Sequence, residues 1–155
     1  MNDYDLHFMS YALDLAKKAY SMNEVPVGAV ITLNNSIIGE GYNQSITNND
    51  PTAHAEIVAI RAASHCVENY RLTDCNMYVT LEPCSMCAGA LVHSRFKKVF
   101  FSTSEPRAGA IISNLNILDQ DFLNHKVEYE FGILEKESSN LLKNFFKQKR
   151  KYKVV

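Results

Sequence analysis

Two short motifs constrain the fold of this chain more than any other feature. His54-Ala55-Glu56 is followed, after 26 intervening residues, by Pro83-Cys84-Ser85-Met86-Cys87. Histidine nitrogen and cysteine sulfur are common zinc ligands, and three protein ligands leave the fourth tetrahedral position open for chemistry. We therefore expect His54, Cys84 and Cys87 to hold one zinc ion per chain, which activates a water while Glu56 moves its protons. Any fold of this chain must bring the two motifs together.

Both motifs are predicted to lie at the starts of buried helices, because a largely apolar stretch follows each one. Cys84 and Cys87 are three residues apart, so one helical face can present both thiols. A helix N-terminus also lowers the pKa of a thiol and favours the thiolate that binds metal. His54 and Glu56 are two residues apart and do not share a helical face. We therefore expect His54 at the helix start, where the turn can direct both side chains into one pocket.

The length and composition are typical of one globular domain. The chain has 155 residues, of which 46% are hydrophobic and 21% charged, and we expect a single domain over 1–155. Its acidic start has neither the basic segment nor the apolar run of a secretion signal, so a cytoplasmic protein without membrane spans is expected. Metal binding is then the better interpretation of Cys84 and Cys87 than a disulfide. Cys66 and Cys75 are expected to be small buried hydrophobic residues.

The net charge of −1 conceals a basic C-terminal segment. Residues 141–155 contain six basic and no acidic residues, which leaves 10 basic and 17 acidic residues in 1–140. A basic end on an acidic body suggests that a polyanion binds there, although a solvated helix end has the same composition. Phe145 and Phe146 lie among these charges, and packing on the core is the expected role of both.

The hydrophobic pattern predicts helices alternating with strands, which favours an α/β layered domain. The expected elements are a helix over 4–20, strands over 26–33 and 36–42 around a turn at Asn34-Asn35, a helix over 51–64, a strand over 76–81, a helix over 84–93, a strand over 97–101, a loop over 102–116, a strand over 126–131, and a last helix that begins near 134 and runs into the basic tail.

The resemblance of the chain to a known family rests on motifs spread over nearly its whole length. They are E-V-P-V-G-A-V from Glu24, G-E-G-Y-N from Gly39, D-P-T-A-H-A-E from Asp50, N-Y-R-L from Asn69, Y-V-T-L-E-P-C-S-M-C-A-G-A from Tyr78, H-S-R from His93, G-I-L from Gly132 and the F-F-K-Q-K-R tail. With these motifs the chain resembles the bacterial tRNA-specific adenosine deaminases of the cytidine deaminase-like superfamily.

The resemblance implies a three-layer α/β/α cytidine deaminase-like domain with a central five-stranded mixed sheet. It implies a homodimer that converts the wobble adenosine of a tRNA anticodon arm to inosine, with no DNA as natural substrate. In that family pattern His54, Cys84 and Cys87 hold zinc, Glu56 moves protons and Asn43 contacts the flipped base. The candidate substrate contacts are Asn43, Ala55, Glu105, Phe146, Lys147 and Arg150.

Several alternatives remain open at the level of sequence. Asn43 could be a turn residue, and Glu82 could either support the metal ligands or be a solvated charge. The chain could deaminate a free base or nucleoside of the cytidine or guanine type, or it could be a zinc-stabilised RNA-binding module without catalysis. Two departures from the family pattern, Glu105 in place of a frequent Asp and Ala110-Ile111-Ile112 in place of smaller residues, concern the 102–116 loop and the preference for flanking nucleotides.

Overall fold

The computed structural model describes residues 2–153, and the side chain of Lys153 and residues 154–155 of the predicted basic tail lie outside its described part. The elements in chain order are α1 Asp3–Ser21, β1 Gly28–Leu33, β2 Ser36–Tyr42, α2 Ala55–Val67, β3 Asn76–Leu81, α3 Ser85–His93, β4 Lys98–Thr103, the 3-10 turn η1 Ile117–Asp119, β5 Glu128–Phe131 and α4 Glu135–Lys153. These elements confirm the predicted order of helices and strands. None of the described helices combines the length and apolar character needed to cross a membrane.

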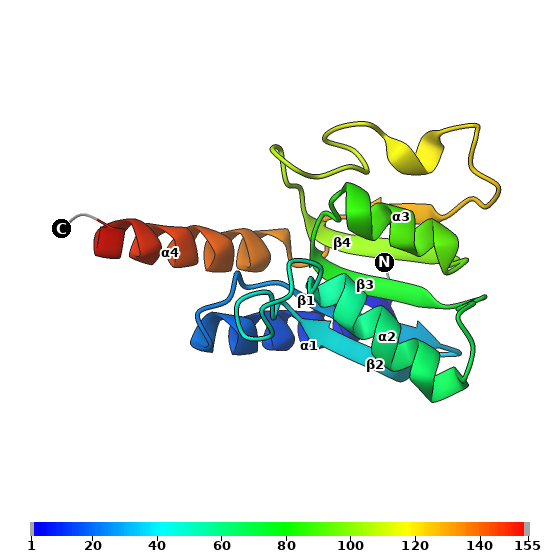
Figure 1. Ribbon diagram of the computed structural model, residues 1–155, viewed down its shortest axis with the longest axis horizontal. Coiled ribbons are helices and arrows are strands. Elements are labelled where there is room, and N and C mark those ends of the chain that lie inside the picture. Colours follow the sequence, from blue (N-terminus) through cyan, green and yellow to red (C-terminus); the bar gives the residue numbers. More distant parts are fainter. Residues whose placement is uncertain (1, 154–155) are drawn as a thin grey trace.

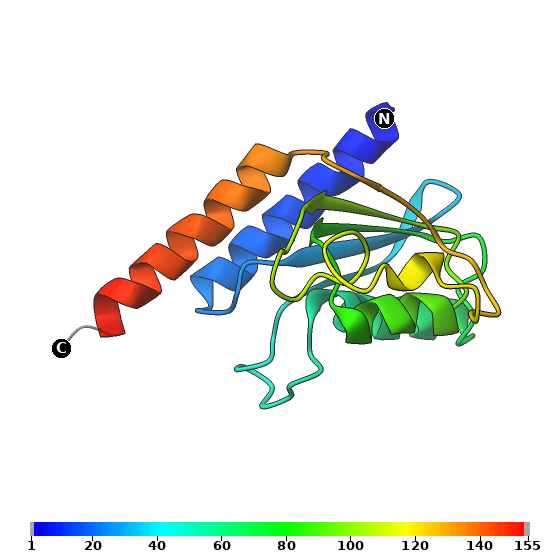
Figure 2. The same cartoon turned by 90° about the horizontal axis from the view of Figure 1, so that it is seen from above.

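The helices cover both faces of a five-stranded mixed sheet with strand order β2-β1-β3-β4-β5. Seen from above, α1 and α4 lie on one face and α2 and α3 on the other, and α4 extends past the sheet (Figures 1 and 2). Apolar residues of the sheet pack on α2 and α3 in one cluster and on α1 in a second. The predicted three-layer α/β/α architecture is therefore confirmed.

The strand directions explain why α2 and α3 begin at the same place. β1 is antiparallel to both β2 and β3, so β2 and β3 point the same way, and β3 is parallel to β4. Each of the two helices follows the carboxyl end of a strand and connects it to another strand of the same direction, as in β-α-β units. The first turns of α2 and α3 therefore lie at one edge of the sheet, which is the edge where such folds place ligands.

Several strand ends differ from the expected bounds by one or two residues, and the loop expected over 102–116 begins only after Thr103, where β4 ends. Three other expectations differ more. The regular helix after Pro51 begins only at Ala55, because residues 51–54 form a turn that ends at the cap residue His54. Cys75 is buried as expected, but Cys66 is exposed because it lies on the outer side of the last turn of α2. Of the two tail phenylalanines, Phe145 is buried against Tyr20 of α1, whereas Phe146 is 44% exposed.

The position of α2 depends on a close approach to β2. A Cβ atom added to Gly41 would lie 2.6 Å from the carbonyl oxygen of Ala55 and 2.7 Å from the nitrogen of Ala59. Real Cβ atoms do not come this close to backbone atoms, so only glycine lets the first turns of α2 rest directly on the strand.

We expect Gly41→Ala to push α2 away from the sheet. Overpacking of this kind costs about 1–3 kcal/mol of the free energy of unfolding, which denaturant titration measures. Ala62→Ser, on the exposed face of the same helix, should change stability by no more than about 0.5 kcal/mol. A Gly41→Ala variant as stable as the unmodified chain would contradict this account of the packing.

Candidate metal centre and substrate groove

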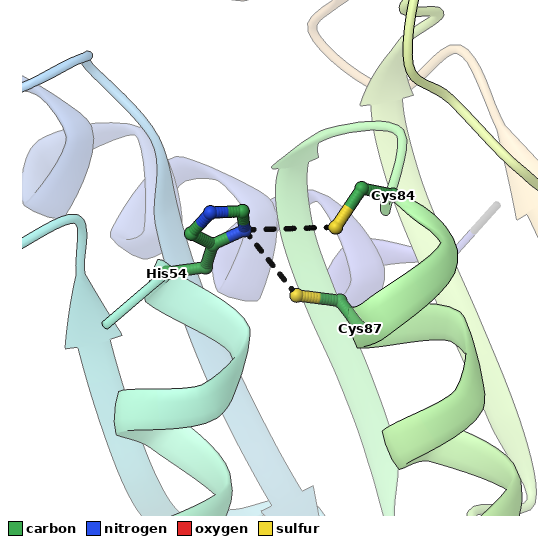
Figure 3. Close-up of side chains that lie close together, drawn as sticks. All are labelled: His54, Cys84 and Cys87. Carbon is green, nitrogen blue, oxygen red and sulfur yellow. Dashed lines mark hydrogen bonds between the residues drawn. The ribbon is translucent and has the colours of Figure 1, made fainter. Parts of the chain in front are cut away.

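Two cap residues bring the sequence motifs together. His54 is the N-cap of α2 and Cys84 is the N-cap of α3, and both have extended backbone conformations. Their side chains turn toward each other across the gap between the two helix starts, and Cys87 joins them from the first turn of α3 (Figure 3). The predicted placement of His54 at a helix start is thus confirmed.

The spacing of the three side chains fits a zinc ion. Nδ1 of His54 lies 3.6 Å from Sγ of Cys84 and 3.6 Å from Sγ of Cys87, and all three candidate ligand atoms lie within 4.8 Å of one another. Zinc bonds of about 2.0–2.1 Å to nitrogen and about 2.3 Å to sulfur at tetrahedral angles would place these atoms about 3.6 Å apart. The donor set and its geometry are those of a site for a soft divalent cation.

The three side chains shift one another's pKa values. The hydrogen bond with Cys87 lowers the pKa of Cys84 to about 4, and the contact with His54 acts in the same direction. The same hydrogen bond, together with burial, raises the pKa of Cys87. The hydrogen bond with Cys84 raises the pKa of His54. One thiolate is therefore already present at neutral pH, and a cation bound there would displace the remaining protons.

Glu56 lies beside this group in the first turn of α2 and is only 4% exposed. Burial raises the pKa of its carboxyl above the usual range. His54, Cys84 and Cys87 all contribute to the pKa of this carboxyl group, so it lies close to the three candidate ligands. A carboxyl group whose pKa is shifted toward neutrality can both take up and release a proton during a reaction.

Asn43, just after β2, connects the site to the start of α2. Its Oδ1 accepts a hydrogen bond of 2.7 Å from the backbone nitrogen of Ala55. This bond satisfies one of the free N–H groups at the helix start, so the side chain of the cap residue His54 remains available as a ligand. Asn43 can still offer a substrate its two Nδ2 hydrogens and the second lone pair of Oδ1. Ala55 itself is fully buried, and its N–H is used within the protein.

A groove of about 730 Å³ lies between one side of α4, from Glu135 to Arg150, and the segment that follows β4. Of the candidate substrate contacts, Glu105, Phe146 and Arg150 line it, whereas Lys147 is not among the lining residues. The other lining cations are Arg107, Lys143 and Lys149. Phe146 lies on the same face of α4 as these lining residues. It is therefore exposed, while its neighbour Phe145 is buried.

Two buried glutamates hold loops near the site. Glu24, 2% exposed, accepts hydrogen bonds from the backbone nitrogens of Ile46 and Thr47 at 3.2 and 2.7 Å, and from the Thr47 hydroxyl at 2.6 Å. Glu82, also 2% exposed, binds the segment after β4 in the same manner. The interpretation of Glu82 as a solvated charge is therefore wrong, because the carboxylate is enclosed by backbone donors. Sequence reasoning missed both roles, although each glutamate belongs to a motif shared with the family.

Comparison with known proteins agrees with this geometry. Residues 2–103 match the family model of the cytidine and deoxycytidylate deaminase zinc-binding region. The tRNA-specific adenosine deaminase of Haemophilus influenzae is 46% identical over 155 residues, which cover 99% of this chain and 90% of that protein. A relative of the same description from Bacillus subtilis is 41% identical over 146 residues and covers 94% of this chain and 91% of its own length.

Solved structures show the same fold. A structure from work on A-to-I editing by tRNA:A34 deaminases at the wobble position of transfer RNA superposes with a TM-score of 0.86 at 38% identity, over 88% of this chain and 99% of that one. The guanine deaminase of Nitrosomonas europaea superposes with a TM-score of 0.72 at 19% identity, over 90% of this chain and 83% of that one, and shares the fold alone. On this likeness in sequence and structure, the chain belongs to the tRNA-specific adenosine deaminases of the cytidine deaminase-like superfamily.

Proposed function

We propose that this chain is a zinc-dependent hydrolase that converts adenosine to inosine, with release of ammonia, at the wobble position of a tRNA anticodon. The observation that carries the proposal is the convergence of His54, Cys84 and Cys87 beside the buried carboxyl group of Glu56. A purely structural zinc site has four protein ligands and no use for an adjacent carboxyl group. Membership of this family supports adenosine in tRNA, and not a free base, as the substrate.

The proposed proton transfers use Glu56. Bound zinc would supply a water acidified toward a pKa of about 7. Glu56 takes a proton from the attacking water and delivers it to N1 of adenine, which makes C6 more electrophilic. After the oxygen has added to C6, Glu56 takes the remaining proton from that oxygen and gives it to the amino group. The C6–N bond then breaks, so that ammonia leaves and inosine remains. The raised pKa of Glu56 suits a group that must hold a proton between two steps.

Recognition of the base begins at Asn43. Its Nδ2 group donates to an acceptor nitrogen of the adenine, while Oδ1 stays bound to Ala55. The reacting base must leave any stack to reach a site this enclosed, which costs a few kcal/mol in a duplex and less in a loop. An anticodon loop, whose bases can turn outward, therefore suits the site better than double-stranded nucleic acid, and DNA is not expected as natural substrate.

The groove beside α4 is proposed to hold the nucleotides that flank the reacting adenosine. Four cations line it together with the exposed ring of Phe146, so phosphates and a stacked base find complementary groups there. Residues 141–155 are in this view the RNA-binding end of one deaminase domain that spans 1–155. We also infer a cytoplasmic location, because tRNA is the proposed substrate.

A homodimer is the proposed assembly. The outward side of α3 leaves Met86 36% exposed and Gly89 and Ala90 half-buried, on a helix with hardly any polar residues. Apolar surface of this kind on a short helix next to the site is suited to packing against a second copy.

We expect the unmodified chain to carry about one zinc ion and to form inosine in an anticodon stem-loop with a wobble adenosine. His54→Ala and Cys84→Ser should lose both the metal and the activity. Glu56→Gln should keep the metal but lose about 10²–10⁴-fold in turnover, because only the proton transfers are removed. Metal analysis and inosine detection by nuclease digestion and chromatography measure the two effects. Near-normal turnover of Glu56→Gln would refute the proton-transfer role and favour a binding module, and conversion of free nucleosides alone would favour the nucleoside deaminase.

The salt dependence of stem-loop binding should show whether RNA contacts the cations of the groove more than the other cations of α4. Each phosphate contact on a single strand contributes about −0.7 to the slope of log affinity against log salt. Removing Lys143 and Arg150, which line the groove, should flatten the slope by about 1.4. Removing Lys147 and Lys151, which are exposed but do not line it, changes the net charge equally and should flatten it less. Equal effects of the two double variants would show that RNA does not prefer the groove.

Light scattering at micromolar concentration tests the proposed assembly. We expect a particle of twice the chain mass of 17.5 kDa. Ala90→Glu should shift the particle to the mass of one chain, because a carboxylate in an apolar contact loses its hydration without gaining a partner. A single-chain mass for the unmodified protein would contradict the dimer.

A further inference from the structure

The carboxylate of Glu82 accepts five hydrogen bonds from one segment of the chain, residues 105–113. Oε1 accepts from the Glu105 nitrogen at 3.0 Å and from the Ser113 hydroxyl at 2.5 Å. Oε2 accepts from the nitrogens of Ile111, Ile112 and Ser113 at 3.0, 2.9 and 2.9 Å. A buried carboxylate is tolerated only when such bonds replace its hydration. Both oxygens are therefore fully used in holding this segment.

Close packing shows how tightly the segment lies against the carboxylate. A Cβ atom on Gly109 would collide with the carboxyl group of Glu82, so the backbone passes directly over it. Gly109 also forms a β-bridge with Cys84, and the Ala110 nitrogen donates to the Pro83 carbonyl at 2.9 Å. The segment thus follows the strand end that leads into the Cys84 motif.

The held segment forms part of the groove. Glu105, Pro106 and Arg107 line one side of it, and residues of α4 such as Phe146 line the other. Glu82 itself is not among the lining residues, and its five bonds go to the segment and not to the candidate metal ligands. Its influence on the groove must therefore pass through the position of the segment.

We propose that Glu82 is a positioning residue whose carboxylate fixes residues 105–113, so that Glu105, Pro106 and Arg107 form one wall of the substrate groove. The inference rests on the proposed function in one respect, which is that the groove receives the RNA substrate. A glutamine at this position keeps the size of the side chain but replaces one acceptor oxygen by an NH2 group. At the Oε2 position the NH2 group meets three backbone donors, and at the Oε1 position it meets the backbone nitrogen of Glu105. In either orientation at least one backbone donor of the segment loses its acceptor, which weakens the attachment.

Glu82→Gln is tested with the stem-loop substrate, by metal analysis and by amide hydrogen exchange. The backbone amides of Glu105, Ile111, Ile112 and Ser113 should lose protection, while those of β3 keep theirs. KM for the stem-loop should rise about tenfold or more, the loss expected for disrupted bonds to a charged acceptor, and kcat should stay within about twofold because Glu56 and the metal ligands are untouched. Zinc content should be unchanged. A lowered kcat with unchanged KM, a loss of zinc, or unchanged protection of the segment would each overturn the proposal.

Two further variants keep the result interpretable. Glu128→Gln removes the same charge from an exposed position on β5 and should leave KM unchanged. Ser113→Ala removes only the hydroxyl donor and should raise KM by roughly threefold, so it carries the test if Glu82→Gln does not fold. A failure of the unmodified chain to form inosine would count against the proposed function alone, since the exchange of residues 105–113 is measured without substrate.

Discussion

The candidate site depends on one geometric constraint, which is that α2 and α3 start side by side at the carboxyl edge of β2 and β3. Because β2 and β3 point the same way, both helix starts reach the same edge although 30 residues separate His54 from Cys84. Each start contributes its cap residue as a candidate ligand, and Cys87 follows within one turn. At the start of α2, Asn43 satisfies one of the free N–H groups of the helix, so the side chain of the cap residue His54 is not needed for that purpose.

Two buried carboxylates hold the loops around this edge, and neither is paired with a cation of the described residues. Glu24 and Glu82 lie beneath the loops, and each is surrounded by backbone donors and hydroxyl groups instead of cations. For both, hydrogen bonds to these donors outweigh the effect of burial and lower the pKa of the carboxyl group, so both remain ionised. Glu56 is also buried, but burial prevails there and raises the pKa of its carboxyl group. The same side chain thus holds loops at two positions and is suited to proton transfer at the third.

The groove and the metal centre both adjoin the carboxyl end of β3 but face different layers. The candidate ligands come from α2 and α3 on one face of the sheet, whereas Phe146 and Arg150 come from α4 on the other face (Figure 2). The segment that Glu82 holds passes between them, since it bridges to Cys84 and also lines the groove. The basic groove therefore lies beside the metal centre on an otherwise acidic chain, where it can attract a polyanion.

The sequence by itself determined the candidate ligands, because residue type and spacing carry the chemistry of His54, Cys84 and Cys87, and hydrophobic periodicity placed most of the helices and strands. It could not decide which of two adjacent phenylalanines faces the core, since the rotation of α4 is set by its contact with α1. It also left Glu82 undecided between a solvated charge, which was wrong, and a support of the metal ligands, and it did not foresee the bonds that the carboxylate makes. Its partners are backbone N–H groups more than twenty residues away, and every residue except proline has such a group, so no pattern of side chains marks them. Only the tertiary path of the chain brings those donors together around one carboxylate.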